Sequence, residues 1–503
     1  MKILVATGRL AQTTVRAAVQ ENADVLVLDI DIAAFITPGL LRSSLPAGQY
    51  DLILVPGLVS SDFTDLEAEC GTRICLGPRH AYDLTPVLSC VSELELSKTI
   101  PADEFLSKKM RKDALMRINE HERNARPAFE LCGRKIGGSS AMKVMAEIAG
   151  ATGMSEERLV EKIREFEEKG ADVIDLGATM DASIDDIIRS VKIAKSTTKL
   201  PVSIDTLNQD LIVAGIESGA DLVLSLNSKN IDAVKDAVVE HETAVVIIPD
   251  QGDHETLYRN IEYAKDLGIE KIIADPVLDP VGHGIAQSIC RYGDFRKKDE
   301  RTPLFFGVGN VTELIDADSV GVNALLAGIA AELGADVLFT PEHSDKARGS
   351  IAELVTASQM MVLARERQSS PKDLGIDLLI LKEKRYLPDA EVPEKSILAD
   401  QKSKWAPDPA GCLRIEISRE RGLIIVTHRK ATITGTDVCR IITTAIDLGL
   451  ISQLDHAGYL GKELARAKLA ISLGWNYVQD EPFEKTSHSH SGRSETHYAE
   501  IGR

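Results

Sequence analysis

Several short apolar runs in the middle of the chain read as buried strands, and each contains or precedes a carboxylate, an amide or a hydroxyl group. Carboxylate and amide oxygens at the rim of an apolar slot accept hydrogen bonds from the N–H groups of a flat ligand. The candidate binding residues are Asp175, Thr179, Asp205, Asn227, Asp275 and Asn310. The alternative for Asp205 and Asp275 is that each caps the helix that follows it, as Asp after a strand often does.

The stretches between these polar strand ends predict the elements that position them. Helix-like stretches end in K-G-A-D at 169–172, S-G-A-D at 218–221 and L-G-A-D at 333–336, and L-G-I-E at 267–270 is a looser copy. Gly after the last helical residue is a common helix stop, and an apolar strand follows it.

About eight such units over about 240 residues predict a (β/α)8 TIM barrel, in which the loops after the strands open on one face and bring their polar residues together. The strands are expected near 135–138, 172–176, 200–204, 221–226, 243–248, 271–275, 303–307 and 336–340. An open, doubly wound sheet is the alternative, because α/β alternation alone does not establish closure.

Composition restricts the class of protein. With 503 residues, 44% of them hydrophobic, and a formal net charge of -19, we expect a protein of several domains without general affinity for nucleic acid or membranes. No apolar stretch is long enough to span a bilayer, and residues 1–9 read as a strand and a turn rather than a secretion signal. The seven cysteines form no C-x-x-C pair, which predicts free, mostly buried thiols in a reducing cytoplasm.

Changes in pattern along the chain predict its domains. Residues 1–104 predict a parallel α/β domain of Rossmann-like or flavodoxin-like type without a G-x-G-x-x-G loop, and 105–130 a charged helical linker. The barrel is expected at 131–370. A small α+β domain at 371–484 has predicted strands in L-L-I-L-K, L-R-I-E-I and G-L-I-I-V-T-H, and 485–503 predict a disordered tail. Histidines in such a tail make a poor metal site, so no metal is predicted.

Basic side chains for an anionic part of a substrate are also expected at the strand ends. Lys143 is placed after the first predicted strand, and His283 follows the sixth. The loop after the eighth strand contains His343, Lys346 and Arg348. Because this loop lies on the same face as the candidate binding residues, we expect its basic groups to contact the ligand. A surface histidine without such a role is the alternative for His283.

Three of these fragments resemble the third, fourth and sixth strand motifs of the pterin-binding superfamily, which contains dihydropteroate synthase and the methyltetrahydrofolate-type methyltransferases. They are V-S-I-D-T at 202–206, L-V-L-S-L-N at 222–227 and I-I-A-D-P at 272–276. The layout of the whole chain resembles archaeal dihydropteroate synthase-related proteins. The resemblance implies that Asp205, Asn227 and Asp275 hold a pterin ring. It also places Asp175 and Thr179, in V-I-D-L-G-A-T, beside that ring.

The resemblance to dihydropteroate synthase itself is incomplete. The expected first strand reads K-I-G-G-S-S-A-M-K where a synthase has N-V-T-P-D-S-F, and the seventh reads G-V-G-N-V-T where a synthase has S-R-K. The seventh strand and D-P-V-L-D-P-V-G resemble the methyltransferase branch instead. In that branch the Asn at the position of Asn310 contacts the pterin nitrogen that carries the methyl group. Asn310 and Asp205 are therefore the expected catalytic residues.

The resemblance implies a cytoplasmic, dihydropteroate synthase-like transferase that uses a reduced pterin, of the tetrahydromethanopterin or folate type, in pterin biosynthesis or one-carbon metabolism. Three alternatives stay open: a methyltetrahydropterin-dependent methyltransferase with a corrinoid protein partner, a dihydropteroate synthase with other diphosphate ligands, and a non-catalytic pterin carrier or regulatory subunit. The pterin is the expected small-molecule partner, and a homodimer is expected by analogy.

Overall fold

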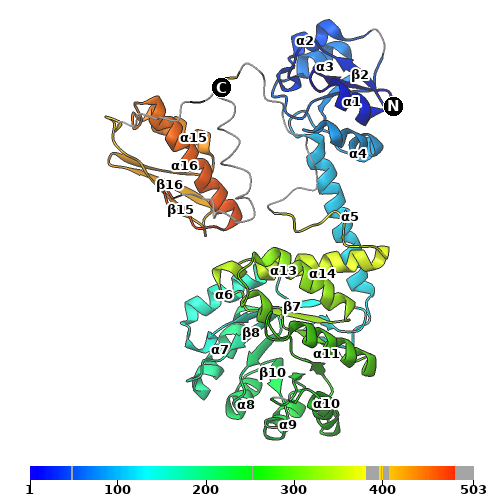
Figure 1. Cartoon of the computed structure of the whole chain (residues 1–503), viewed down its shortest axis with the longest axis vertical. Coiled ribbons are helices and arrows are strands. Elements are labelled where there is room, and N and C mark those ends of the chain that lie inside the picture. The colour runs from blue at the N-terminus through cyan, green and yellow to red at the C-terminus, as the bar shows by residue number, and fades with distance from the viewer. Residues whose placement is uncertain (47–48, 252, 381–395, 398, 400–406, 482–503) are drawn as a thin grey trace, which may run out of the picture. The chain divides into compact units, whose positions relative to one another are not determined.

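The computed structural model describes residues 1–46, 49–251, 253–380, 396–397, 399 and 407–481 (Figure 1). The chain divides into two compact units, Met1–Leu378 and Leu379–Arg503. The predicted tail at 485–503 and the end of the predicted strand L-L-I-L-K lie outside the described residues, and 378–380 form no strand. Within the described residues, no helix is long and apolar enough to cross a membrane.

Eight parallel strands form the central sheet of the first unit, in the order β12-β11-β10-β9-β8-β7-β14-β13. A parallel bridge between Ala274 and Leu304 joins its two outermost strands, so the sheet closes on itself. The predicted barrel is confirmed, and the open sheet is excluded. The strands are β7 (Lys143–Ile148), β8 (Val173–Gly177), β9 (Val202–Asp205), β10 (Leu222–Leu226), β11 (Ala244–Ile247), β12 (Ile272–Ala274), β13 (Phe305–Phe306) and β14 (Val337–Thr340).

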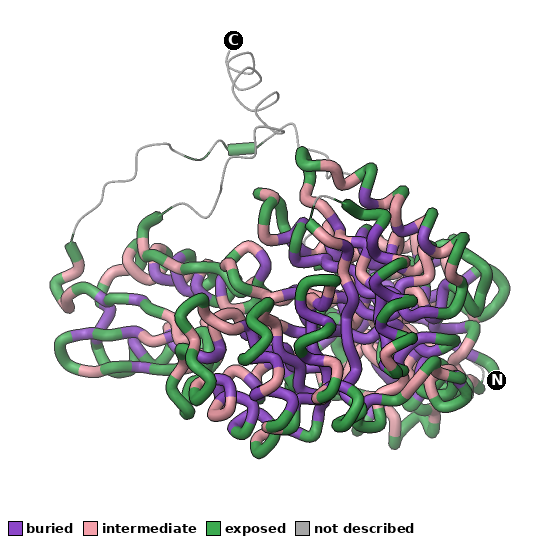
Figure 2. Tube along the Cα trace, turned by 90° about the horizontal axis from the view of Figure 1, so that it is seen from below, coloured by how far each residue is buried: buried purple, intermediate pink, exposed green. Residues whose placement is uncertain are grey.

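Helices surround the strands, and Figure 2 shows the buried residues gathered in the interior, with exposed residues on the outside. Side chains cap the starts of α6, α7 and α8, and Ser183 and Asp186 form a reciprocal capping box at α7. The helices are α6 (Glu156–Glu168), α7 (Ile184–Thr197), α8 (Gln209–Glu217), α9 (Ile231–Glu240), α10 (Thr256–Asp266), α11 (Ile285–Lys298), α12 (Gly309–Thr312), α13 (Ser319–Glu332) and α14 (Ser350–Arg367).

The prediction of the first barrel strand at 135–138 is wrong. Residues Arg134–Ile136 form β6, which pairs antiparallel with β5 (Phe129–Leu131). Leu131 and Ile136 of this hairpin pack with Met145 and Val173 inside the barrel, so the hairpin closes its amino-terminal end. A short β-branched run looks the same in a hairpin and in a buried parallel strand, which explains the error.

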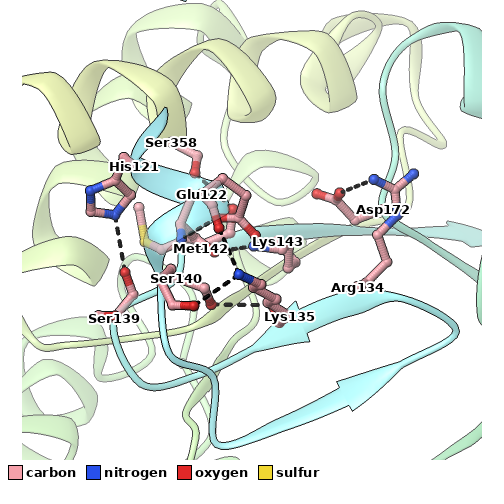
Figure 3. Close-up of polar contacts among 12 residues, drawn as sticks. His121, Glu122, Arg134, Lys135, Ser139, Ser140, Met142, Lys143, Asp172 and Ser358 are labelled. Atoms are coloured by element: carbon pink, nitrogen blue, oxygen red, sulfur yellow. Dashed lines mark hydrogen bonds and ion pairs between the residues drawn. The ribbon is translucent and has the colours of Figure 1, made fainter. Parts of the chain in front are cut away.

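Lys143 consequently begins the first strand instead of following it, and its predicted position is wrong. Its side chain is buried and forms an ion pair of 3.0 Å with Glu122 of α5 (Ala102–Asn124), as Figure 3 shows. Lys135 donates to three carbonyl oxygens at the end of the same helix, each at 2.9 Å. A cation satisfies the free carbonyls of a helix end and favours its dipole, so α5 is fixed firmly to the closed end of the barrel.

The repeated glycine phrases stop the helices as predicted. All four glycines have positive φ, from 70° to 102°, the left-handed conformation that a side chain disfavours: they are Gly170, Gly219, Gly268 and Gly334. The aspartate of each G-A-D copy then accepts the backbone N–H of a residue at the start of the neighbouring strand. These bonds join Asp172 to Val144 (3.0 Å), Asp221 to Val202 (2.9 Å) and Asp336 to Leu304 (2.8 Å).

The remaining two sheets confirm the predicted fold class. The amino-terminal sheet is parallel in the order β2-β1-β3-β4, which is flavodoxin-like, with apolar clusters on both faces. Its strands are β1 (Ile3–Thr7), β2 (Asp24–Val27), β3 (Leu52–Val55) and β4 (Arg73–Leu76). The second unit packs the antiparallel strands β15 (Arg414–Ser418), β16 (Leu423–His428) and β17 (Ala431–Gly435) against α15 (Val438–Asp447) and α16 (Leu454–Leu473).

All seven cysteines lie in the described part of the chain and are free thiols. The expectation that most of them are buried is wrong. Cys75 is buried and Cys90 partly so, whereas the other five are exposed. The exposed thiols lie in turns and on outer helix surfaces, where a scattered sequence pattern does not distinguish them from core residues.

The aspartates at the strand starts are testable as stabilising groups. Asp336→Ala should lower the free energy of unfolding by about 2 to 3 kcal/mol, because the buried N–H of Leu304 loses its acceptor and Arg296 loses a carboxylate 3.5 Å away. Asp336→Asn keeps an oxygen acceptor and should lose less. Urea unfolding followed by circular dichroism measures both, and equal losses would contradict a role as acceptor.

Candidate functional site

Three carboxylates meet at the carboxyl-terminal ends of β7, β8 and β9. One oxygen each of Glu147, Asp175 and Asp205 lies within 4.8 Å of the other two. Glu147 is directly opposite Asp175 in the sheet, and Asp175 is opposite Ser203. Side chains in register on neighbouring strands point to the same face. One row inside the barrel therefore contains Glu147, Asp175 and Ser203, and Asp205 belongs to the next row.

The next row along the strands makes room for Glu147. Gly177 lies opposite Asp205. A Cβ atom at Gly177 would lie only 2.6 Å from Oε1 of Glu147. The missing side chain therefore lets the Glu147 carboxylate reach over β8 toward Asp205.

Hydroxyl groups hold two of the carboxylates. Ser203 donates a short hydrogen bond to Oδ1 of Asp175, and Ser225 donates to Oδ1 of Asp205 at 3.0 Å. Ser225 has φ of +67° at an irregularity in the pairing of β10 with β11, and this turns its hydroxyl toward β9. Asp175 is fully buried, and its second oxygen, Oδ2, has no hydrogen-bond partner among the described residues.

The shared burial makes all three groups hard to ionise. Burial, together with the charges of Asp205 and Glu313, raises the pKa of Glu147 to about 7. Burial and the charges of Asp205 and Glu147 raise the pKa of Asp175 well above its ordinary value. Burial also raises the pKa of Asp205, against the hydrogen bond from Ser225. Like charges that share one site cannot all ionise without help, and perturbed carboxyl groups of this kind mark functional sites.

Asp275 follows β12 on another side of the barrel. The hydroxyl of Tyr292 and the backbone N–H of Val277 both donate to its Oδ1, each at 2.8 Å. Within the described residues, no hydrogen bond to Oδ2 is found. Burial raises the pKa of Asp275 to about 6, against the two donated hydrogen bonds.

The loop after Asp275 holds a strained residue. Val277 has φ of +66°, which is unfavourable for a β-branched side chain. Arg291 of α11 donates to the carbonyl oxygen of Val277 at 2.8 Å and pairs with Asp279 at 2.7 Å. Strain of this kind persists when surrounding bonds enforce it, and it is concentrated at ligand sites.

Asn310 lies in the short helix α12, after β13, and is exposed. Its amide group donates to the carbonyl oxygen of Leu278 at 2.9 Å, so it joins the loops after β12 and β13. Asn227 follows β10 directly, and its side-chain oxygen Oδ1 accepts the backbone N–H of Lys229 at 3.0 Å. Thr179 lies beyond β8 and contacts the hydroxyl of Thr152, at 2.9 Å through its N–H and 3.1 Å through its own hydroxyl.

Of the basic groups expected to bind an anion in the loops after β12 and β14, two form ion pairs with aspartates and two are exposed histidines. Lys346 pairs with Asp316 at 2.9 Å, and Arg348 pairs with Asp345 at 2.8 Å. His283 and His343 have exposed side chains. The backbone N–H of His343 is bound by Glu313, which ties the loop after β14 to the loop after β13.

Three partners of the predicted residues were not expected from the sequence. Glu147 is missed because the first strand is misplaced, although K-V-M-A-E-I shows the same pattern of an apolar run with a carboxylate near its end. Ser203 lies two residues before Asp205, as alternation along a strand requires, and that spacing is a usable signal. Tyr292 lies in a helix, where no local pattern links it to Asp275.

Family models match two parts of the chain. A family model described as Pterin binding enzyme matches residues 148–280, and one described as PterinBD-DUF4346 matches 407–480. Among solved structures, dihydropteroate synthase of Yersinia pestis in a sulfonamide drug complex is 18% identical and covers 48% of this chain and 99% of that chain, with a TM-score of 0.40. The Xanthomonas albilineans enzyme in complex with 7,8-dihydropteroate is 20% identical and covers 46% and 94%, with a TM-score of 0.37.

A relative matches along nearly the whole chain. The Methanocaldococcus jannaschii protein named Uncharacterized protein MJ0107 is 38% identical over 520 residues, which cover 95% of this chain and 98% of that protein. The match therefore includes the amino-terminal domain, the barrel and the second unit together. The chain belongs to the same family as MJ0107, a family of proteins with a dihydropteroate synthase-like pterin-binding domain.

Proposed function

We propose that the barrel binds a reduced pterin at the carboxyl-terminal ends of its strands and acts as a pterin-dependent transferase. The observation that carries this proposal is the state of Asp275. Both internal donors end on Oδ1, so the carboxylate is held rigidly while Oδ2 is left for a ligand. The amino-pyrimidinone edge of a pterin presents adjacent N–H donors, which suit a fixed carboxylate acceptor.

Asn227 and Asp205 complete the proposed contacts with the ring. The side-chain oxygen Oδ1 of Asn227 accepts the N–H of Lys229, so the side-chain NH2 group is the part available to a ligand. That donor matches the single carbonyl group of the pterin ring. Asp205 supplies a further acceptor from β9, and Thr179 lines the adjacent wall beyond β8. Asp175 is fully buried and does not reach the ring.

For the reaction itself, the charges favour one-carbon transfer over condensation with a pterin diphosphate. A diphosphate needs available cations, whereas Lys346 and Arg348 are paired with neighbouring aspartates. In methyl transfer the pterin nitrogen keeps the electron pair of the broken C–N bond, and a nucleophile of the second substrate takes the methyl group. We assign Asn310 to donate a hydrogen bond to that nitrogen, in exchange for its bond to Leu278.

The first prediction concerns the ring contact. Asp275→Ala should weaken binding of a reduced pterin by about 2 to 4 kcal/mol, because donors of the ring would be buried without a partner. Asp181→Ala, which removes an exposed carboxylate from a loop of the same face, is the matched control and should bind like wild type. Calorimetric titration with the methylated and the unmethylated pterin measures both. Equal affinity of the two variants would refute the proposed site.

The second prediction separates the candidate reactions. One-carbon transfer predicts tighter binding of the methylated pterin and methyl exchange with a reduced cobalamin. Dihydropteroate synthesis predicts diphosphate release from a pterin diphosphate and an arylamine, and that outcome would contradict the assignment of Asn310. A pterin carrier predicts tight binding without turnover in either assay.

The third prediction concerns pH. Because Asp275 accepts ring N–H groups best when ionised and has a pKa raised to about 6, pterin affinity should fall as the pH drops below about 6. Tyr292→Phe removes a donor that lowers this pKa, so the midpoint should move to higher pH. Titrations between about pH 5 and 8 measure the shift. A midpoint unchanged in Tyr292→Phe would show that another group controls binding.

A further inference from the structure

Glu147, Asp175 and Asp205 have the arrangement of an ion-binding site. Each comes from a different strand, and one oxygen of each lies within 4.8 Å of the others. We propose that these three carboxylates hold one divalent cation, of the Mg²⁺ or Mn²⁺ class, at the carboxyl-terminal ends of β7, β8 and β9.

The strongest support comes from Asp175. Its side chain is fully buried, Ser203 occupies Oδ1, and Oδ2 has no partner within the described part of the chain. A buried carboxylate oxygen without a hydrogen bond is costly, and buried polar groups in proteins are otherwise nearly always paired. Asp175 lies on β8, between the strands that carry Glu147 and Asp205. A cation bound by all three carboxylates would therefore give Oδ2 a partner.

No protein cation takes this place. Among the described residues, no Lys, Arg or His forms an ion pair with any of the three carboxylates. The aspartates at the opposite end of the barrel differ in this respect. Asp172, Asp221 and Asp336 are paired with Arg134 (3.6 Å), Lys195 (2.6 Å) and Arg296 (3.5 Å). The cluster at β7–β9 therefore lacks the compensation that buried carboxylates receive elsewhere in this domain.

The donor set indicates the class of ion. All three side chains offer carboxylate oxygen, and neither a thiol nor an imidazole belongs to the cluster. Hard cations such as Mg²⁺ and Mn²⁺ prefer oxygen ligands and keep some positions for water or substrate, whereas Zn²⁺ favours nitrogen and sulfur. Gly177 leaves the space that the Glu147 carboxylate occupies, because a Cβ atom there would lie 2.6 Å from its Oε1.

The cation site shares Asp205 with the proposed pterin site but does not depend on pterin binding. A bound cation would compensate the charge of the carboxylates, so a ligand on the same face would meet less negative charge. The test is therefore made without pterin, so a failure here leaves the binding role of Asp275 untouched.

The experiment is a titration of chelator-treated, full-length protein with Mn²⁺, followed by electron paramagnetic resonance and repeated with Mg²⁺ by calorimetry. Wild type should bind one ion per chain. Glu147→Gln should weaken binding by at least about 10-fold, since changes even outside the ligand sphere cost 10- to 100-fold. Thermal unfolding provides a second readout: Mn²⁺ should raise the melting temperature of wild type and not of this variant.

Two further variants separate geometry from charge. Gly177→Ala keeps every carboxylate but displaces that of Glu147, so it should also lose the ion. Asp210→Asn removes an exposed carboxylate at the start of α8 and should bind like wild type. The proposal is overturned if wild type binds no ion, or if Glu147→Gln and Asp210→Asn bind Mn²⁺ equally well.

Discussion

The register of β7, β8 and β9 determines which side chains meet at the centre of the barrel face. Parallel pairing sets Glu147 beside Asp175 and Asp175 beside Ser203, and it sets Gly177 beside Asp205. A slip by one residue would turn Asp175 to the outer side of the sheet, where Ile174 and Leu176 now pack against the helices. This one alignment produces the acidic cluster, the space at Gly177 that the Glu147 carboxylate occupies, and the unpaired oxygen of Asp175.

The two ends of the barrel differ in the partners of their buried carboxylates. At the strand starts, each G-A-D aspartate accepts a neighbouring backbone N–H and has a cation nearby, so the charge is compensated and the groups stabilise the closed sheet. At the ends of β7–β9, the carboxylates stand together with hydroxyl groups as their donors. Burial raises the pKa values of carboxyl groups at both ends, including Asp172 and Asp336. At the strand ends, the other carboxylates of the cluster raise the pKa values of Glu147 and Asp175 further. Uncompensated charge costs stability, and proteins keep such costs mainly where they serve a function.

Much of this could be predicted because it is local. A glycine in the left-handed conformation follows each of the four helices that end in the repeated glycine phrase. The polar residue at a strand end is adjacent in sequence to the strand that carries it. The first strand could not be placed, because the β-like residues 134–136 belong to a hairpin that closes the amino-terminal end of the barrel. That error hid Glu147, and with it the acidic cluster at the ends of β7–β9. The pairing of Lys346 with Asp316 also depends on contacts between loops that no sequence spacing encodes.

Two rigid regions lie at the carboxyl-terminal face of the barrel. On β12, Arg291 holds Val277 in a strained conformation, and the N–H of Val277 together with Tyr292 fixes Asp275. On β10, the positive φ of Ser225 directs its hydroxyl to Asp205. Both strained residues donate a hydrogen bond to a carboxylate, so the backbone energy stored in each, of order 1 to 3 kcal/mol, orients an acceptor. A flat ring with donors along its edge gains from such preorganisation, because acceptors that are already fixed lose little entropy on binding.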